Sequence, residues 1–110
     1  MVLKRLENVL EEFRKLDPEM PMQTALSLLF VYRQQGNGTE VSIKDIAEAI
    51  GMSAAAASRN VSRLCKVGVK QQQGHGLVET FEDPLFRVRK CVRITPKGRR
   101  VIQTIEELLQ

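Results

Sequence analysis

Residues 42–66 constrain this chain more than any other stretch, because their pattern is typical of two short helices joined by a tight turn. Ser42 can cap a first helix, and Asp45 stands three residues later, where a capping box needs a polar side chain. Apolar residues then recur at helical spacing until Gly51, a residue that readily adopts the left-handed conformation ending a helix. Ser53 can cap the next helix. The stretch therefore predicts a helix-turn-helix.

The two faces of the second helix, predicted over residues 53–66, differ in chemistry. Its inward stripe is apolar, whereas its outward face begins with small uncharged residues and ends with basic ones. Small side chains let a helix backbone approach the floor of the major groove, and arginines reach phosphates or guanine edges. The pattern predicts a DNA recognition helix; the alternative is an ordinary helical hairpin with a solvated basic face. The inward residues are Ala57, Val61 and Leu64, and the outward ones are Ala55, Ala56, Arg59, Ser62, Arg63 and Lys66.

Basic residues are distributed unevenly along the chain. The whole sequence has a net charge of +4, but residues 53–100 contain eleven Lys or Arg and three acidic residues, a net charge of +8. The first 35 residues contain five of each sign. A surface that binds a polyanion is therefore expected after the helix turn and not before it.

A β-hairpin is predicted over residues 77–95, with strands at 77–81 and 86–94. Alternation along the second strand places Val88, Val92 and Ile94 on one face and Arg87, Arg89, Cys91 and Arg93 on the other. A basic hairpin after a recognition helix is typical of a wing that lies on the DNA backbone or in a minor groove. The alternative is a surface hairpin whose arginines keep a sheet edge soluble. Residues 39–41 are expected to add a third strand.

Two amphipathic helices are predicted at the termini, over residues 2–16 and 96–109. The N-terminal one carries an apolar stripe that needs a partner surface, either within its own domain or on a second subunit. A further helix over residues 21–35 is apolar almost all round, so we expect it at the centre of the core.

Composition and residue types exclude several classes of function. With 110 residues the chain fits one domain, 1–110, and it contains no long apolar run or signal-peptide pattern, so we expect a cytoplasmic protein with no membrane partner. Cys65 and Cys91 lack metal-ligand spacing, so packed, reduced thiols are the first interpretation and a redox switch the alternative. One histidine, no nucleophile with a nearby base and no phosphate-binding loop argue against an enzyme, a cofactor or a metal site.

Four stretches together resemble the MarR-type winged helix-turn-helix regulators, especially the short phage-type versions. They are residues 41–53, 58–64, 76–84 and 92–98, in that order along the chain. The resemblance implies an α+β, mainly α, fold with a two- or three-stranded antiparallel wing and terminal dimerisation helices. It also implies a homodimer that places two recognition helices in successive major grooves of palindromic DNA, usually to repress transcription.

The sequence departs from that family's pattern in two places. The family's wing usually carries an Asp and an Arg two residues apart near its tip, and these positions fall on Phe86 and Val88 here, with Arg87 and Arg89 close by. The C-terminal part is also shorter than in full-length members, many of which bind small ligands there. We therefore expect no small-molecule effector.

The resulting hypothesis is a non-enzymatic, homodimeric regulator, a repressor by analogy, that binds specific double-stranded DNA. A winged helix used for protein association, or a replication accessory factor on DNA, is the alternative. The residues expected to contact DNA are Ser53, Ala55, Ala56, Ser58, Arg59, Ser62, Arg63, Arg87 and Arg89.

Overall fold

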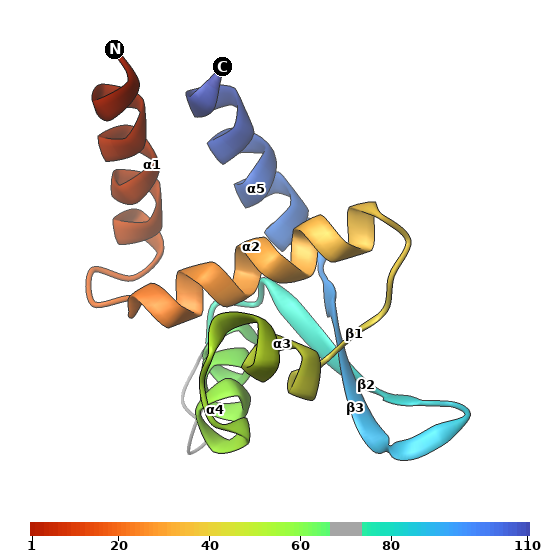
Figure 1. Cartoon of the computed structure of the whole chain (residues 1–110). Coiled ribbons are helices and arrows are strands. Elements are labelled where there is room, and N and C mark those ends of the chain that lie inside the picture. The colour runs from red at the N-terminus through yellow and green to blue at the C-terminus, as the bar shows by residue number, and fades with distance from the viewer. Residues whose placement is uncertain (67–73) are drawn as a thin grey trace.

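The computed structural model describes residues 1–66 and 74–110 and shows a mainly helical molecule with one three-stranded sheet (Figure 1). The winged-helix fold predicted from the sequence is confirmed. The helices are α1 (Val2–Leu16), α2 (Met22–Gly36), α3 (Ile43–Ile50), α4 (Ala54–Leu64) and α5 (Pro96–Leu109). The strands are β1 (Val41–Ser42), β2 (Val78–Asp83) and β3 (Phe86–Ile94).

Local hydrogen bonds define the turn between α3 and α4. The Ser42 hydroxyl accepts from the Asp45 backbone N–H at 3.0 Å, and the Asp45 carboxylate accepts from the Ser42 N–H at 2.9 Å, so both halves of the predicted capping box form. Gly51 ends α3 in the left-handed region, at φ +81°. The Ser53 hydroxyl then accepts from Ala56 N–H at 3.1 Å and caps α4.

Helix α4 ends at Leu64, two residues before the predicted boundary, and Cys65 is already extended. Residues that follow the helix donate hydrogen bonds to its last carbonyls. Leu77 N–H donates to the Leu64 carbonyl at 2.7 Å, and His75 N–H donates to the Arg63 carbonyl at 3.1 Å. These bonds replace the ones that another helical turn would make, so the helix stops where the wing segment returns to it.

A polar link that the apolar pattern did not reveal joins α4 to α2. Alongside the expected inward residues Ala57, Val61 and Leu64, Asn60 is only 7% exposed. Its side-chain oxygen accepts from the Thr24 hydroxyl, and its amide nitrogen donates to the Ala56 carbonyl at 2.8 Å. Because both buried polar groups are satisfied, the link fixes the position of the recognition helix without a desolvation penalty.

Helix α2 crosses the middle of the molecule, as expected, but it is not buried all round (Figure 1). Its buried residues are Thr24, Ser27, Leu28 and Val31. Leu26 is 46% exposed and Leu29 is only half-buried, because no other described element fully covers that side of the helix. Part of the apolar surface predicted to be core is therefore open.

The sheet is antiparallel in the order β1-β3-β2, and the predicted third strand is present, with Val41 opposite Val92. Burial along β3 does not follow the two predicted faces: Val88 is 85% exposed although Val92 is buried, and Cys91 is fully buried among the arginines. Strand β1 pairs only with the base of β3, at Cys91 and Val92, so the base is enclosed while the outer half of the hairpin projects from the molecule (Figure 1).

The terminal helices lie together at the end of the molecule opposite the hairpin (Figure 1). Val9 and Phe13 of α1 and Ile102 and Ile105 of α5 are buried there. Leu16 is half-buried against the core, while the N-terminal part of the α1 stripe is exposed and is not covered by any of the described residues. Its exposed apolar residues are Val2, Leu3, Leu6 and Leu10.

A close contact joins the wing to α5. Thr95 caps the helix by accepting from Gly98 N–H at 3.1 Å, and its hydroxyl donates to the Gly76 carbonyl at 2.7 Å. A Cβ at Gly98 would lie 2.1 Å from the Leu77 carbonyl oxygen, so only glycine permits this approach.

Over the described residues, no helix has the length and apolar character needed to cross a bilayer.

Replacing Ser42 with alanine is expected to lower the free energy of unfolding by about 1 kcal/mol, because the first turn of α3 loses its cap. Urea denaturation followed by circular dichroism measures the change. Thr39→Ala, at an exposed position three residues earlier, is the matched control. Equal stability of the Ser42 variant and the wild type would contradict the role given to the capping box.

Candidate nucleic-acid interface

The outward face of α4 carries positive charge without compensation. Ala55, Ser58, Arg59 and Arg63 are exposed, and the helix contains no acidic residue. Within residues 1–66 and 74–110, neither arginine forms an ion pair. The predicted residues at the start of the helix and the two arginines therefore share one solvent-facing surface, which can accept phosphates.

A hollow of about 620 Å³ connects α4 to the wing. Ser58 of α4 and Phe86 and Val88 of β3 line it. Charged side chains of both signs complete its walls: Lys44, Lys90 and Arg89 with Asp45 and Glu48. The lysines were not among the predicted contact residues, because the helical and strand patterns show each element alone and not the groove between two elements.

A second hollow, of about 550 Å³, continues along α4 toward the end of the helix. Ser58, Ser62, Lys66 and Lys90 line it together with the sheet residue Glu79. Ser58 and Lys90 border both hollows, so they mark the middle of a continuous surface between the recognition helix and the wing.

Arg89 has surroundings different from those expected of a free DNA contact. Its guanidinium donates to Asp83 at 3.0 Å and to Asp45 at 3.3 Å, and Glu40 lies 3.7 Å away. Its side chain is 34% exposed. Three carboxylates hold this cation, so Arg89 fixes the wing to the start of α3 instead of presenting a free charge, whereas the neighbouring Arg87 is exposed.

Two of the carboxylates that hold Arg89, Asp45 and Asp83, have lowered pKa values. Partial burial raises the pKa of Asp45, but hydrogen bonds from Ser42 and the Arg89 charge outweigh it and leave the pKa below its usual value. The backbone N–H of Leu85 and the Arg89 guanidinium lower the pKa of Asp83. Both groups are thus held as anions, and the pKa of Arg89 is raised in turn, first by Asp83.

The same region contains a group of possible metal ligands, in which Glu40, Asp83 and Cys91 offer atoms within 4.8 Å of one another. Both carboxylates already pair with Arg89, and burial raises the pKa of the Cys91 thiol, so the group forms a salt-bridge network. Burial likewise raises the pKa of Cys65, which makes this thiol less reactive than a free one.

The wing tip is apolar. Asp83 faces Phe86 in the hairpin register, so Pro84 and Leu85 form a two-residue loop. Leu85 is 95% exposed, Phe86 63% and Val88 85%. The tip thus exposes contiguous apolar surface at the positions where the sequence comparison with MarR-type wings places a charged pair.

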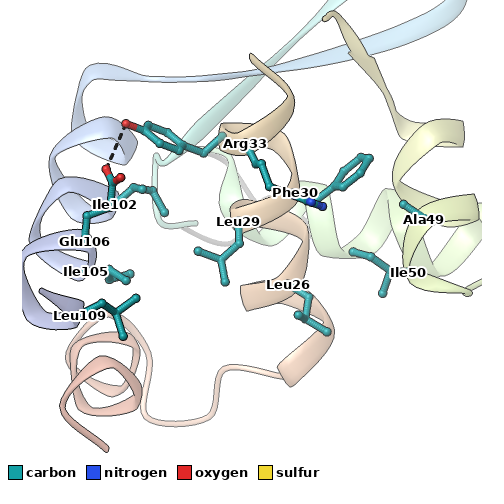
Figure 2. Close-up of a pocket in the computed structure, with 11 residues that line it drawn as sticks. Leu26, Leu29, Phe30, Arg33, Ala49, Ile50, Ile102, Ile105, Glu106 and Leu109 are labelled. Carbon is teal, nitrogen blue, oxygen red and sulfur yellow. Dashed lines mark hydrogen bonds between the residues drawn. The ribbon is translucent and has the colours of Figure 1, made fainter. Parts of the chain in front are cut away.

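A third hollow, of about 610 Å³, lies on the opposite side of the molecule, between α2, α3 and α5 (Figure 2). Its walls are apolar, with Arg33 on one side and a hydrogen bond from Tyr32 to Glu106 at 3.4 Å on the other. Figure 2 shows Ile105 and Leu109 of α5 facing Leu29 of α2 across it. This is the open apolar surface of α2 described above.

The helix-turn-helix matches a family model described as winged helix-turn-helix DNA-binding, over residues 33–69. Three solved structures share the arrangement of helices and wing. A MepR Q18P mutant from a multidrug-resistant S. aureus clinical isolate is 16% identical with a TM-score of 0.75, covering 92% of this chain and 64% of that one. The S. aureus MepR–DNA complex is 17% identical with a TM-score of 0.71, and the match covers 96% of this chain and 73% of that one. The heme sensor PefR from Streptococcus agalactiae, in complex with heme, is 21% identical with a TM-score of 0.69, covering 97% and 67%.

This chain has the MarR-type winged helix-turn-helix fold. The chain spans 64% of the MepR Q18P mutant, a little under two thirds of that protein's length. A search of curated protein sequences finds no significant match. The family match covers β1, α3 and α4 and ends before the strands of the wing.

Removing the Arg89 charge is expected to raise the pKa of Asp83 and Asp45 toward the ordinary aspartate value of about 3.9. A carboxyl with a lowered folded pKa stabilises the fold above its unfolded pKa, and this contribution disappears as pH falls through the folded pKa. Arg89→Gln should therefore reduce the loss of stability on acidification. Carboxyl ¹³C NMR titration measures both pKa values.

Arg93→Gln is the matched control, because Arg93 lies on the same strand but pairs with Glu79, at 2.7 Å. That variant should leave the titration of Asp83 and Asp45 unchanged. An unchanged titration in Arg89→Gln would show that the arginine does not hold the two carboxylates.

Proposed function

We propose that this protein is a double-stranded DNA-binding transcriptional regulator that acts as a homodimer in the cytoplasm. One observation supports it most strongly: the outward face of α4 has no acid and has two arginines that form no ion pair within residues 1–66 and 74–110. This face borders the hollow shared with the wing. A helix of this kind enters the major groove while flanking basic residues contact phosphates.

Small side chains at the start of α4 shape the expected mode of binding. Ala55 and Ala56 offer methyl contacts, and Ser53 uses its hydroxyl oxygen to cap the helix, so few side chains there form paired hydrogen bonds with a base. We propose that phosphate contacts and DNA shape provide much of the affinity. Arg59, Arg63 and Arg87 are the arginines assigned to this role, and Arg89 positions the wing.

The homodimer is proposed from the exposed apolar surfaces of the terminal helices. Leu3, Leu6 and Leu10 of α1 and Leu109 of α5 are exposed. The two helices contact each other at the end of the molecule away from α4 (Figure 1). An exposed apolar stripe of this length is typical of a subunit contact. A dimer formed there leaves both recognition helices free, and its two-fold symmetry predicts a palindromic binding site.

The expectation that no small-molecule effector acts on this chain stays a prediction. The hollow between α2 and α5 is within the size range of ligand pockets, and the related PefR structure was solved with heme. We propose that the second subunit occupies part of this hollow, because its apolar wall continues to the exposed Leu26 and Leu109.

The second candidate function is association with a protein through the wing, and the apolar tip is the observation that favours it. The two functions differ in a simple experiment. A regulator retards duplex DNA in a mobility-shift assay, whereas a protein-association module does not.

Arg63→Ala is expected to weaken duplex binding without unfolding the protein, because the side chain is exposed and unpaired among the described residues. The slope of log affinity against log salt should fall by about 0.9 for each phosphate that the variant no longer neutralises. Fluorescence anisotropy with a duplex selected from a random library, between about 50 and 200 mM salt, measures both quantities.

Arg14→Ala is the matched control, since it removes the same charge from an exposed position on α1. Unchanged affinity and slope in Arg63→Ala would show that this side of α4 does not face DNA. A wild-type isotherm that hardly moves with salt would contradict the electrostatic mode of binding.

Leu6→Glu is expected to convert the dimer to monomer, because it places a charge within the proposed apolar contact. DNA affinity should then fall, since one half-site is bound at a time. Analytical ultracentrifugation measures the mass, with Gln103→Glu on α5 as a control of equal charge. A wild-type mass of one chain at all concentrations would contradict the dimer.

A further inference from the structure

We infer that the tip of the wing, Pro84 to Phe86 together with Val88, is an apolar wedge that enters the minor groove and partly unstacks a base step. This inference rests on the proposed function, because it assigns a role to the wing of a DNA-bound regulator. It replaces the expected basic wing with one whose tip acts through shape and apolar contact.

The exposure of the tip needs an explanation. Leu85, Phe86 and Val88 are each more than 60% exposed, and they follow one another on a hairpin that projects from the molecule (Figure 1). Contiguous apolar surface of this kind marks a binding site in a folded protein. Proline, leucine and phenylalanine are among the side chains that proteins insert between base steps from the minor groove.

The tip is also rigid, which a wedge requires. Asp83 accepts from Leu85 N–H at 2.9 Å, so its carboxylate closes the two-residue loop. The same carboxylate accepts from Arg89, which also reaches Asp45 at the start of α3. The orientation of the tip relative to the helix-turn-helix is thus set before DNA is bound, so little ordering entropy is lost on binding.

The position of the tip fits an adjacent minor groove. Phe86 and Val88 line the same hollow as Ser58 of α4, and Figure 1 shows the hairpin and α4 at the end of the molecule away from both termini. With α4 in the major groove, a hairpin that flanks it lies over the neighbouring backbone and minor groove.

Charge around the tip favours DNA over a protein as the occupant. Arg87 is exposed beside Phe86, and Lys44 and Lys90 line the hollow behind it. Two acidic residues line the same hollow, Glu48 and Asp45, but Asp45 is paired with Arg89, so positive charge remains in excess. These cations are continuous with the basic face of α4, so a polyanion can cover the apolar tip and all of them at once. A protein partner would need an acidic ring around an apolar pocket.

The test uses the full-length protein and a duplex selected by the wild type from a random library. End-to-end fluorescence energy transfer measures bending, 2-aminopurine in place of each adenine in turn reports unstacking, and anisotropy gives the salt slope. Wild type should bend the duplex by about 20–90° and raise 2-aminopurine fluorescence at one step in each half-site.

Three variants separate a wedge from a charge. Phe86→Ser should bind roughly tenfold more weakly, leave the duplex unbent and keep the wild-type salt slope. Phe86→Leu retains an apolar wedge and should restore bending. Arg87→Gln should keep the bend but lower the slope. Thermal unfolding of each variant checks that the fold is intact. The Phe86 variants should unfold at the wild-type temperature, because Phe86 is exposed and contributes little to the core.

The outcomes distinguish this inference from the function on which it rests. If wild type binds the selected duplex but leaves it straight and stacked, the wedge is wrong and the regulator stands. If Phe86→Ser binds and bends DNA like wild type, the wedge is also wrong. The exposed apolar tip would then be interpreted as a binding site for a protein. If wild type retards no duplex at all, the proposed function fails, and the wedge fails with it.

Discussion

The interaction on which the rest of this structure depends is the one between Arg89 and three carboxylates. Asp83 belongs to the wing, Asp45 to the capping box of α3, and Glu40 to the segment before β1. One guanidinium therefore joins the hairpin to the helix-turn-helix and fixes the angle between them. Because an ion pair with several hydrogen-bonded partners is more rigid than an isolated surface pair, the two DNA-facing elements form one surface and not two independent ones.

The molecule divides its surfaces between two tasks. The end that carries α4 and the wing is basic, with an apolar hairpin tip. The opposite end, built from α1 and α5, exposes leucines that this chain does not cover. Buried polar groups lie between these ends, where Asn60 and Thr24 connect the recognition helix to α2. A second subunit on the leucines and a duplex on the basic end can thus be bound at the same time without competing for a surface.

Much of the fold could be predicted from the sequence, because its signals are local. Ser42, Asp45 and Gly51 specify the helix turn through capping and backbone conformation, and residues 2–16 specify a helix through periodicity. The site was less predictable. The pattern identified Arg59 and Arg63 on the outward face of α4, but it placed Arg89 among free cations, whereas the fold brings three acids from distant positions around it. Lys44 and Lys90 were missed for the same reason: they border a groove that exists only when β3 and α3 are adjacent.

The most direct test of the account is a ¹H–¹⁵N NMR titration of the labelled protein with its selected duplex. If α4 and the wing bind as one surface, the amide signals of the first turns of α4 and of residues 84–90 shift together, at the same DNA concentration, while those of α1 and α5 keep their positions. Shifts confined to α4, with the wing unaffected, or shifts centred on the terminal helices would contradict it.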